Sequence, residues 1–254
     1  MKSTSAVALM LGMWVFSAWG WGVTQAAEPS LGSSFEQWCQ QKASLSAERR
    51  KTMEVLLEEA GTNDCELAAK NLSSGTEMYL ISRQITDLTP LAGFTNLEVL
   101  ILDSNQITDV TPLARLTNLK HLILAGSQIT DLTPLAGLTK LEELYLESNQ
   151  IKDITPLAGL ANLKTLQLMY NQIADLTPLA GLKNLEALHL SGNQITDVTP
   201  LGGLANLKAL NLDYNQITDI TPLAGLANLD RLYLPGNPIT QPTCPITDRD
   251  VCHF

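Results

Sequence analysis

A hydrophobic pattern with a period of 22 residues runs through the chain from Gly75 onward. Full units begin at Leu97, Leu119, Leu141, Leu163, Leu185 and Leu207, a degenerate unit begins at Gly75 and a truncated one at Leu229. In the unit starting at Leu97, the aliphatic positions are Leu97, Leu100, Leu102, Ile107, Val110, Leu113 and Leu116. A Thr-Pro-Leu tripeptide returns seven times at the same spacing. The pattern is therefore an internal repeat, which is typical of a solenoid.

Each unit predicts a strand, a turn and a short helical turn. Leu100, Ile101 and Leu102 alternate between inward and outward positions, as in a short strand. The chain must turn at Asn105, whose side chain can satisfy backbone groups left unpaired there. Asp109 and the threonine two residues on are expected to cap a helical turn that the following proline starts.

One unit buries too few side chains to be stable alone, so the units must stack. The ends of the stack need covers, because an open sheet end exposes unpaired backbone groups. From Ser34 to about Leu72 the sequence predicts a small helical cap, with Ser46 beginning its second helix, Gly61 ending it and Asp64 preceding a third segment.

Residues 1–26 are expected to be a secretory signal peptide. Lys2 is followed by an uncharged apolar run from Ala6 to Val23, and Thr24-Gln25-Ala26 offers a small-residue cleavage context. The alternative is an uncleaved anchor, because such a run can just span a bilayer. We expect cleavage, no stable membrane insertion afterwards, and a secreted or periplasmic protein.

Four cysteines fit an oxidising compartment. Four cysteines allow three pairings. The repeats separate Cys39 and Cys65 from Cys244 and Cys252, so a stiff rod permits only the pairs Cys39–Cys65 and Cys244–Cys252. Four free buried thiols are the alternative.

The repeat Leu-x-x-Leu-x-Leu-x-x-Asn-x-Ile-x-Asp-x-Thr-Pro-Leu resembles the 22-residue leucine-rich-repeat class of bacterial internalins. The resemblance implies an α/β solenoid: a right-handed superhelix with a parallel concave sheet, a helical N-terminal cap and protein binding. The expected organisation is a signal peptide at 1–26, a helical cap at 27–74, about eight repeats at 75–240 and a disulfide-closed C-terminal cap at 241–254. The chain shows no internalin-type anchor or following immunoglobulin-like domain, which leaves host-cell adhesion open.

Composition and charge narrow the function. The net charge of −10 and the absence of a basic stripe argue against a nucleic-acid partner. No nucleophile-elbow, phosphate-loop or His-Glu-x-x-His motif occurs, and His121 and His189 fall three strands apart, about 14 Å at ordinary strand spacing. His121 and Glu143 form at most a surface pair. We expect no enzyme, no cofactor and no metal.

The residues that vary between repeats are the candidates for binding. Tyr79, Ile101, Ile123 and Tyr145 form an expected apolar stripe on the concave face, beside an acidic margin of Asp103, Glu143 and Glu147. Met169, Tyr170, Tyr214 and Tyr233 form a looser aromatic set. We expect a protein or peptide partner of unknown identity. The alternative is a carbohydrate-contacting or structural envelope protein, in which the tyrosines stack on sugars.

A ladder of buried asparagines is expected behind the sheet, at Asn105, Asn149, Asn171, Asn193, Asn215 and Asn237. Ser127 interrupts it, and so does Arg83, which we expect near carboxylates of the cap or in water.

Overall fold

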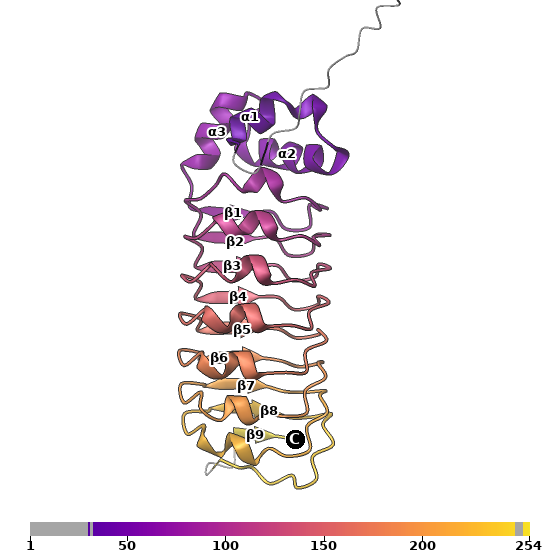
Figure 1. The fold of residues 1–254 in the computed structure, drawn as a ribbon, viewed down its shortest axis with the longest axis vertical. Helices are drawn as coiled ribbons and strands as arrows, with labels where there is room; N and C mark the ends of the chain where they lie inside the picture. Colours follow the sequence, from indigo (N-terminus) through magenta and orange to yellow (C-terminus); the bar gives the residue numbers. More distant parts are fainter. Residues whose placement is uncertain (1–29, 31–32, 247–250) are drawn as a thin grey trace, which may run out of the picture.

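The computed structural model describes residues 30, 33–246 and 251–254. Within them, nine parallel strands form one sheet in sequence order (Figure 1). The strands are β1 Glu77–Tyr79, β2 Val99–Ile101, β3 His121–Ile123, β4 Glu143–Tyr145, β5 Thr165–Gln167, β6 Ala187–His189, β7 Ala209–Asn211, β8 Arg231–Tyr233 and β9 Cys252–His253. The expected solenoid with a parallel concave sheet and caps is confirmed.

The return path of each of the first seven repeats holds a short 3-10 helix. These helices are η2 Thr89–Leu91, η3 Thr111–Arg115, η4 Thr133–Leu135, η5 Thr155–Gly159, η6 Thr177–Gly181, η7 Thr199–Leu201 and η8 Thr221–Gly225. Each begins at the threonine, one residue earlier than the proline that we expected to start it. The aspartate two residues before that threonine accepts its backbone N–H, as Asp109 Oδ1 does from Thr111 at 2.8 Å. The aspartate thus caps the helical turn, and the threonine supplies the N–H that donates to it.

The core is a continuous column of aliphatic side chains. Leu100, Leu102 and their equivalents in later repeats have no exposed surface. The strands contribute every second residue to this column, because successive side chains of a strand point to opposite faces. The other set faces outward and is free to vary between repeats.

The asparagine ladder closes the turns behind the strands. Asn149 Nδ2 donates to the carbonyls of Leu124 and Leu146 at 3.0 and 3.1 Å, and its Oδ1 accepts from Ile129 N–H at 3.0 Å. The same contacts recur at Asn105, Asn171, Asn193, Asn215 and Asn237. Each amide therefore joins two consecutive repeats.

The two irregular ladder positions behave differently. Arg83 Nη2 lies 2.6 Å from Glu58 Oε2 of the cap, the first of the two surroundings expected for it. Ser127 is buried, and its hydroxyl has no hydrogen-bond partner among the described residues. The ladder thus has a gap at the third repeat.

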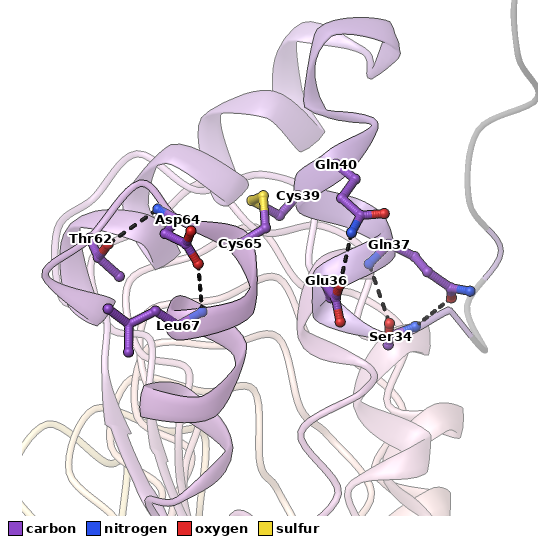
Figure 2. The surroundings of a disulfide bond; sticks show 9 residues. All are labelled: Ser34, Glu36, Gln37, Cys39, Gln40, Thr62, Asp64, Cys65 and Leu67. Carbon is purple, nitrogen blue, oxygen red and sulfur yellow. Dashed lines mark hydrogen bonds between the residues drawn. A yellow bond between two sulfur atoms is a disulfide. The ribbon is translucent and has the colours of Figure 1, made fainter.

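Helices cover the N-terminal end of the stack, as Figure 1 shows. They are α1 Phe35–Gln40, η1 Lys42–Ser44, α2 Ala47–Ala60 and α3 Cys65–Ser73. Ser34, Ser46 and Asp64 cap the three α-helices, and Gly61 ends α2 with a φ of 68°. A disulfide joins Cys39 of α1 to Cys65 of α3 (Figure 2). The cap docks on the first repeat through Thr52, whose hydroxyl donates to the Asp87 carbonyl at 2.7 Å.

The C-terminal end is closed by a second disulfide, Cys244–Cys252, which is the expected pair. Cys252 lies in β9, which pairs with β8 in parallel. The described residues form no helix long and apolar enough to cross a membrane. The expected signal peptide at 1–26 lies outside the described residues.

Candidate partner-binding surface

The outward face of the sheet carries three rows of side chains in strict register. The middle row runs through Tyr79, Ile101, Ile123, Tyr145, Gln167, His189, Asn211 and Tyr233, and each residue lies opposite the next. Neighbouring residues in a row are about 4.8 Å apart, so their side chains form one surface. The first four residues of this row are called the apolar stripe below.

The apolar stripe is open to solvent at its N-terminal end. Tyr79 is 48% exposed, whereas Ile101, Ile123 and Tyr145 are half-buried. The phenol of Tyr79 donates to Glu77 Oε2 at 2.6 Å, and that of Tyr145 donates to Glu143 Oε2 at 3.1 Å. Burial and the nearby Glu143 charge raise the pKa of Tyr145. Both rings are held by carboxylates of their own strands, which leaves an ordered apolar surface between them.

Three carboxylates border the stripe. Glu143 lies 3.3 Å from His121 Nδ1 and accepts from Tyr145, so it is well partnered. Glu147 is half-buried, and its Oε2 has no hydrogen-bond partner among the described residues. Burial raises the pKa of the Glu147 carboxyl, and the charge of Asp103 adds to this effect. Only Ala125 separates Asp103 from Glu147 in their row, so both carboxylates face one small gap.

The C-terminal half of the middle row is polar. Burial and the nearby Arg231 lower the pKa of His189. The ring of Tyr233 stacks on His253 with 4.9 Å between centroids, which covers one of its faces. Met169 lies in the row beyond the middle one and is half-buried. The apolar character of the face is therefore confined to the first four strands.

Tyr170 and Tyr214, two members of the looser aromatic set, lie outside the strands. Both lie in the turn after the strand, with φ of 55° and 52°. They are the most exposed large apolar residues among those described, at 61% and 65%. The left-handed turn before each ladder asparagine therefore holds both tyrosines just beyond the C-terminal ends of β5 and β7.

A second surface was missed entirely by the sequence reasoning. The residue before each strand alternates in charge from repeat to repeat, through Glu98, Lys120, Glu142, Lys164, Glu186, Lys208 and Asp230. Each lysine pairs with the glutamate of the preceding repeat at 2.6–2.8 Å. Exposed asparagines two residues earlier bond to the repeat before, as Asn162 does to Thr139 O at 2.8 Å. Comparing equivalent positions in every second repeat would have revealed the alternation.

The five charges from Glu142 to Asp230 line a shallow groove of about 650 Å³, together with asparagines of the same repeats. Exposed ion pairs of this kind contribute little stability each, about 0–1 kcal/mol. Among residues 30, 33–246 and 251–254, no three His, Cys, Asp or Glu side chains come together as metal ligands. His121 and His189 lie on β3 and β6, three strands apart.

The comparisons with known proteins agree with this geometry. Family models described as leucine-rich repeats match residues 117–159, 161–203 and 196–239. The crystal structure of internalin C2 from Listeria monocytogenes is 35% identical with a TM-score of 0.71, covering 79% of this chain and 89% of internalin C2. No curated protein matches the chain.

Two further solved structures are longer than this chain. An internalin from Listeria monocytogenes, inlF, is 34% identical with a TM-score of 0.71, covering 75% of this chain and 57% of inlF. A leucine-rich-repeat protein from Leptospira interrogans is 28% identical with a TM-score of 0.61, covering 68% of this chain and 46% of that protein. The chain thus spans about half the length of these two.

The parallel sheet, the asparagine ladder and the helical cap define a leucine-rich-repeat protein. Within that class, the chain belongs to the internalin-like family of bacterial leucine-rich-repeat proteins. Proteins with this fold generally bind other proteins, and the family is typically non-catalytic.

Proposed function

We propose that this protein is exported and binds a protein or peptide partner on its concave face, at the apolar stripe Tyr79, Ile101, Ile123 and Tyr145. The observation that carries the proposal is the unbroken register of these four side chains across β1–β4. Contiguous exposed apolar surface often marks an interaction site, and tyrosine is favoured as an anchor there. Two disulfides support an oxidising compartment, secreted or periplasmic.

The acidic margin supports a basic group at the rim of the partner. Glu147 has an unpartnered oxygen, and its carboxylate shares the gap over Ala125 with Asp103. A lysine or arginine of the partner, placed in that gap, would neutralise two charges that otherwise repel each other. Charge complementarity of this kind favours the correct partner and speeds association.

The test is a pull-down from the native extracellular or periplasmic fraction, with residues 27–254 as bait. A second bait carries Ile123→Ala and Tyr145→Ala, and a matched control carries Gln167→Ala and Asn211→Ala in the polar half of the same row. We expect the stripe variant to lose about tenfold or more in affinity for the captured protein, because truncated anchors dominate interface energies. The control should bind as the parent does, with equal melting temperatures throughout. Equal binding by all three baits would refute the proposal.

Export is tested separately, by N-terminal sequencing of the protein from its native host. The expected mature chain starts within one or two residues of Ala27. Recovery of the intact chain in the membrane fraction would indicate the anchor instead.

A further inference from the structure

The turn after each strand holds one residue in the left-handed conformation. This position is occupied by Ser82, Ser104, Gly126, Ser148, Tyr170, Gly192, Tyr214 and Gly236, with φ between 52° and 76°. The left-handed region suits glycine, and a bulky side chain there is a rare and strained choice. The N-terminal repeats use serine or glycine, whereas two C-terminal repeats use tyrosine. Strained residues of this kind concentrate at functional sites.

Each tyrosine is matched by a glycine in the next repeat. A Cβ at Gly192 would lie 2.6 Å from Tyr170 Cδ1, and one at Gly236 would lie 2.5 Å from Tyr214 Cδ1. Both rings therefore lie in the space that the next side chain would fill. The close approach is specific to the glycines that follow a tyrosine repeat. At Gly126, which follows a serine repeat, an added Cβ would meet only Ser104 atoms at 3.6–3.8 Å. The two glycines keep the two rings in place along the solenoid axis.

The two rings form a pair of exposed aromatic platforms. They are 61% and 65% exposed and occupy equivalent turn positions two repeats apart, about 10 Å at ordinary strand spacing. No ring contact covers them among the described residues, whereas Tyr233 is covered by His253. Their separation leaves no contiguous apolar patch, which a protein interface needs at its core.

The turns that follow the left-handed residues carry polar side chains, with amides and charged groups among them. A glutamine follows each ladder asparagine except Asn237, which Pro238 follows, and both Gln194 and Gln216 are exposed. Gln150 and Gln172 line a hollow of about 300 Å³ with Thr130, Lys152 and Asp153. Free amides supply both donors and acceptors. Aromatic platforms flanked by amides are suited to a ligand with apolar ring faces and many hydroxyls.

Aspartates of the same repeats disfavour anionic ligands. A row of aspartates follows the glutamines, one in each repeat, through Asp131, Asp153, Asp175, Asp197 and Asp219. Hydrogen bonds from the threonine two residues on lower the pKa of each of these carboxyls. They stay ionised at neutral pH, so the potential here is negative.

We propose that Tyr170 and Tyr214 bind a neutral oligosaccharide chain, with one sugar ring stacked on each phenol and hydroxyls bonded to the glutamine row. The C–H bonds of a pyranose ring meet the negative face of an aromatic ring favourably. This site is separate from the apolar stripe in position and in ligand chemistry, and it does not depend on the function proposed above.

The experiment measures binding of cellohexaose, chitohexaose and mannohexaose to residues 27–254, by saturation-transfer NMR and by calorimetry. When the tyrosine ring protons are irradiated, the signals of at least one of the three oligosaccharides should lose intensity. Tyr170→Ser combined with Tyr214→Ser should weaken that binding about tenfold or more. Serine already occupies the equivalent turn at Ser148, so this variant is expected to fold.

A second pair of variants leaves both tyrosines in place. Gly192→Ala displaces the Tyr170 ring and should reduce the affinity, whereas Gly126→Ala imposes the same backbone strain without touching a tyrosine and should not. The proposal is overturned if none of the three oligosaccharides binds, or if the double serine variant binds as the parent does. Capture of a protein that requires Tyr170 and Tyr214 would equally overturn it, in favour of a second protein-binding site.

Discussion

The N-terminal and C-terminal halves of the repeat array share one backbone and differ in surface. Inward leucines recur in both halves, and the ladder asparagine recurs in every repeat except the first and third, where Arg83 and Ser127 replace it. The middle row is apolar from Tyr79 to Tyr145 and polar from Gln167 to Asn211. The left-handed turn carries small residues in the first half and tyrosine–glycine pairs in the second. The repeated inward positions determine the fold, whereas the outward and turn positions differ between repeats and give each half its own surface.

The first prediction tests whether the asparagine ladder stabilises the backbone that both halves share, at Asn149, where the two halves meet. Asn149→Leu should lower the free energy of unfolding by about 1–3 kcal/mol, because Ile129 N–H and the Leu124 carbonyl lose their partner in a buried place. Urea denaturation measures the change. Asn162→Leu is the control, since its exposed amide makes one bond and should cost less than about 0.5 kcal/mol. Equal losses at both positions would contradict the ladder argument.

The second prediction concerns the gap in the N-terminal half. Ser127→Asn should be neutral or raise the free energy of unfolding by up to about 1 kcal/mol, because the amide would add the rung that the other repeats have. Thermal and urea unfolding of the single variant measure this. A clear loss of stability would mean that the turn at Gly126 and Ser127 cannot hold an asparagine, and that the halves differ in backbone as well as in surface.

The sequence was sufficient for the fold because the repeat constrains it many times over. Seven returns of one tripeptide predict the solenoid. A buried asparagine in a turn must bond to backbone groups, so the contacts of Asn105 and its equivalents could also be predicted. Strand periodicity did not show that Tyr170 lies in a left-handed turn, because the period of a strand does not mark where such a turn begins. It also missed the alternation from Glu98 to Asp230, which has a period of two repeats and is invisible in a single template. What escapes prediction is the part that differs between units.

The third prediction asks whether the tyrosine platforms are structural. Ser148→Gly should stabilise the protein by about 0.5 kcal/mol, since glycine relieves the strain of the left-handed turn at some entropic cost. Tyr170→Gly gains the same relief but loses the contact of its ring with Gly192, so its net effect should be close to zero. Thermal unfolding compares the two. A loss above about 1 kcal/mol for Tyr170→Gly would make the ring part of the packing rather than a surface kept for a ligand.

The smallest expected effect concerns Glu147 in the N-terminal half, whose Oε2 has no hydrogen-bond partner among the described residues. Burial raises the pKa of Glu147 in the folded protein, so the folded state holds that proton more tightly than the unfolded state does. Its charge therefore disfavours folding at neutral pH, and this penalty disappears as the pH falls through the folded pKa toward the ordinary value near 4.3. Glu147→Gln should be slightly more stable than the parent at pH 7 and equal to it at pH 4. Glu143→Gln is the matched control, because Glu143 accepts from Tyr145 and pairs with His121, and its loss should destabilise at pH 7. If Glu147→Gln also destabilises at pH 7, the Glu147 carboxylate has a partner within the protein and is not reserved for a basic group of the ligand.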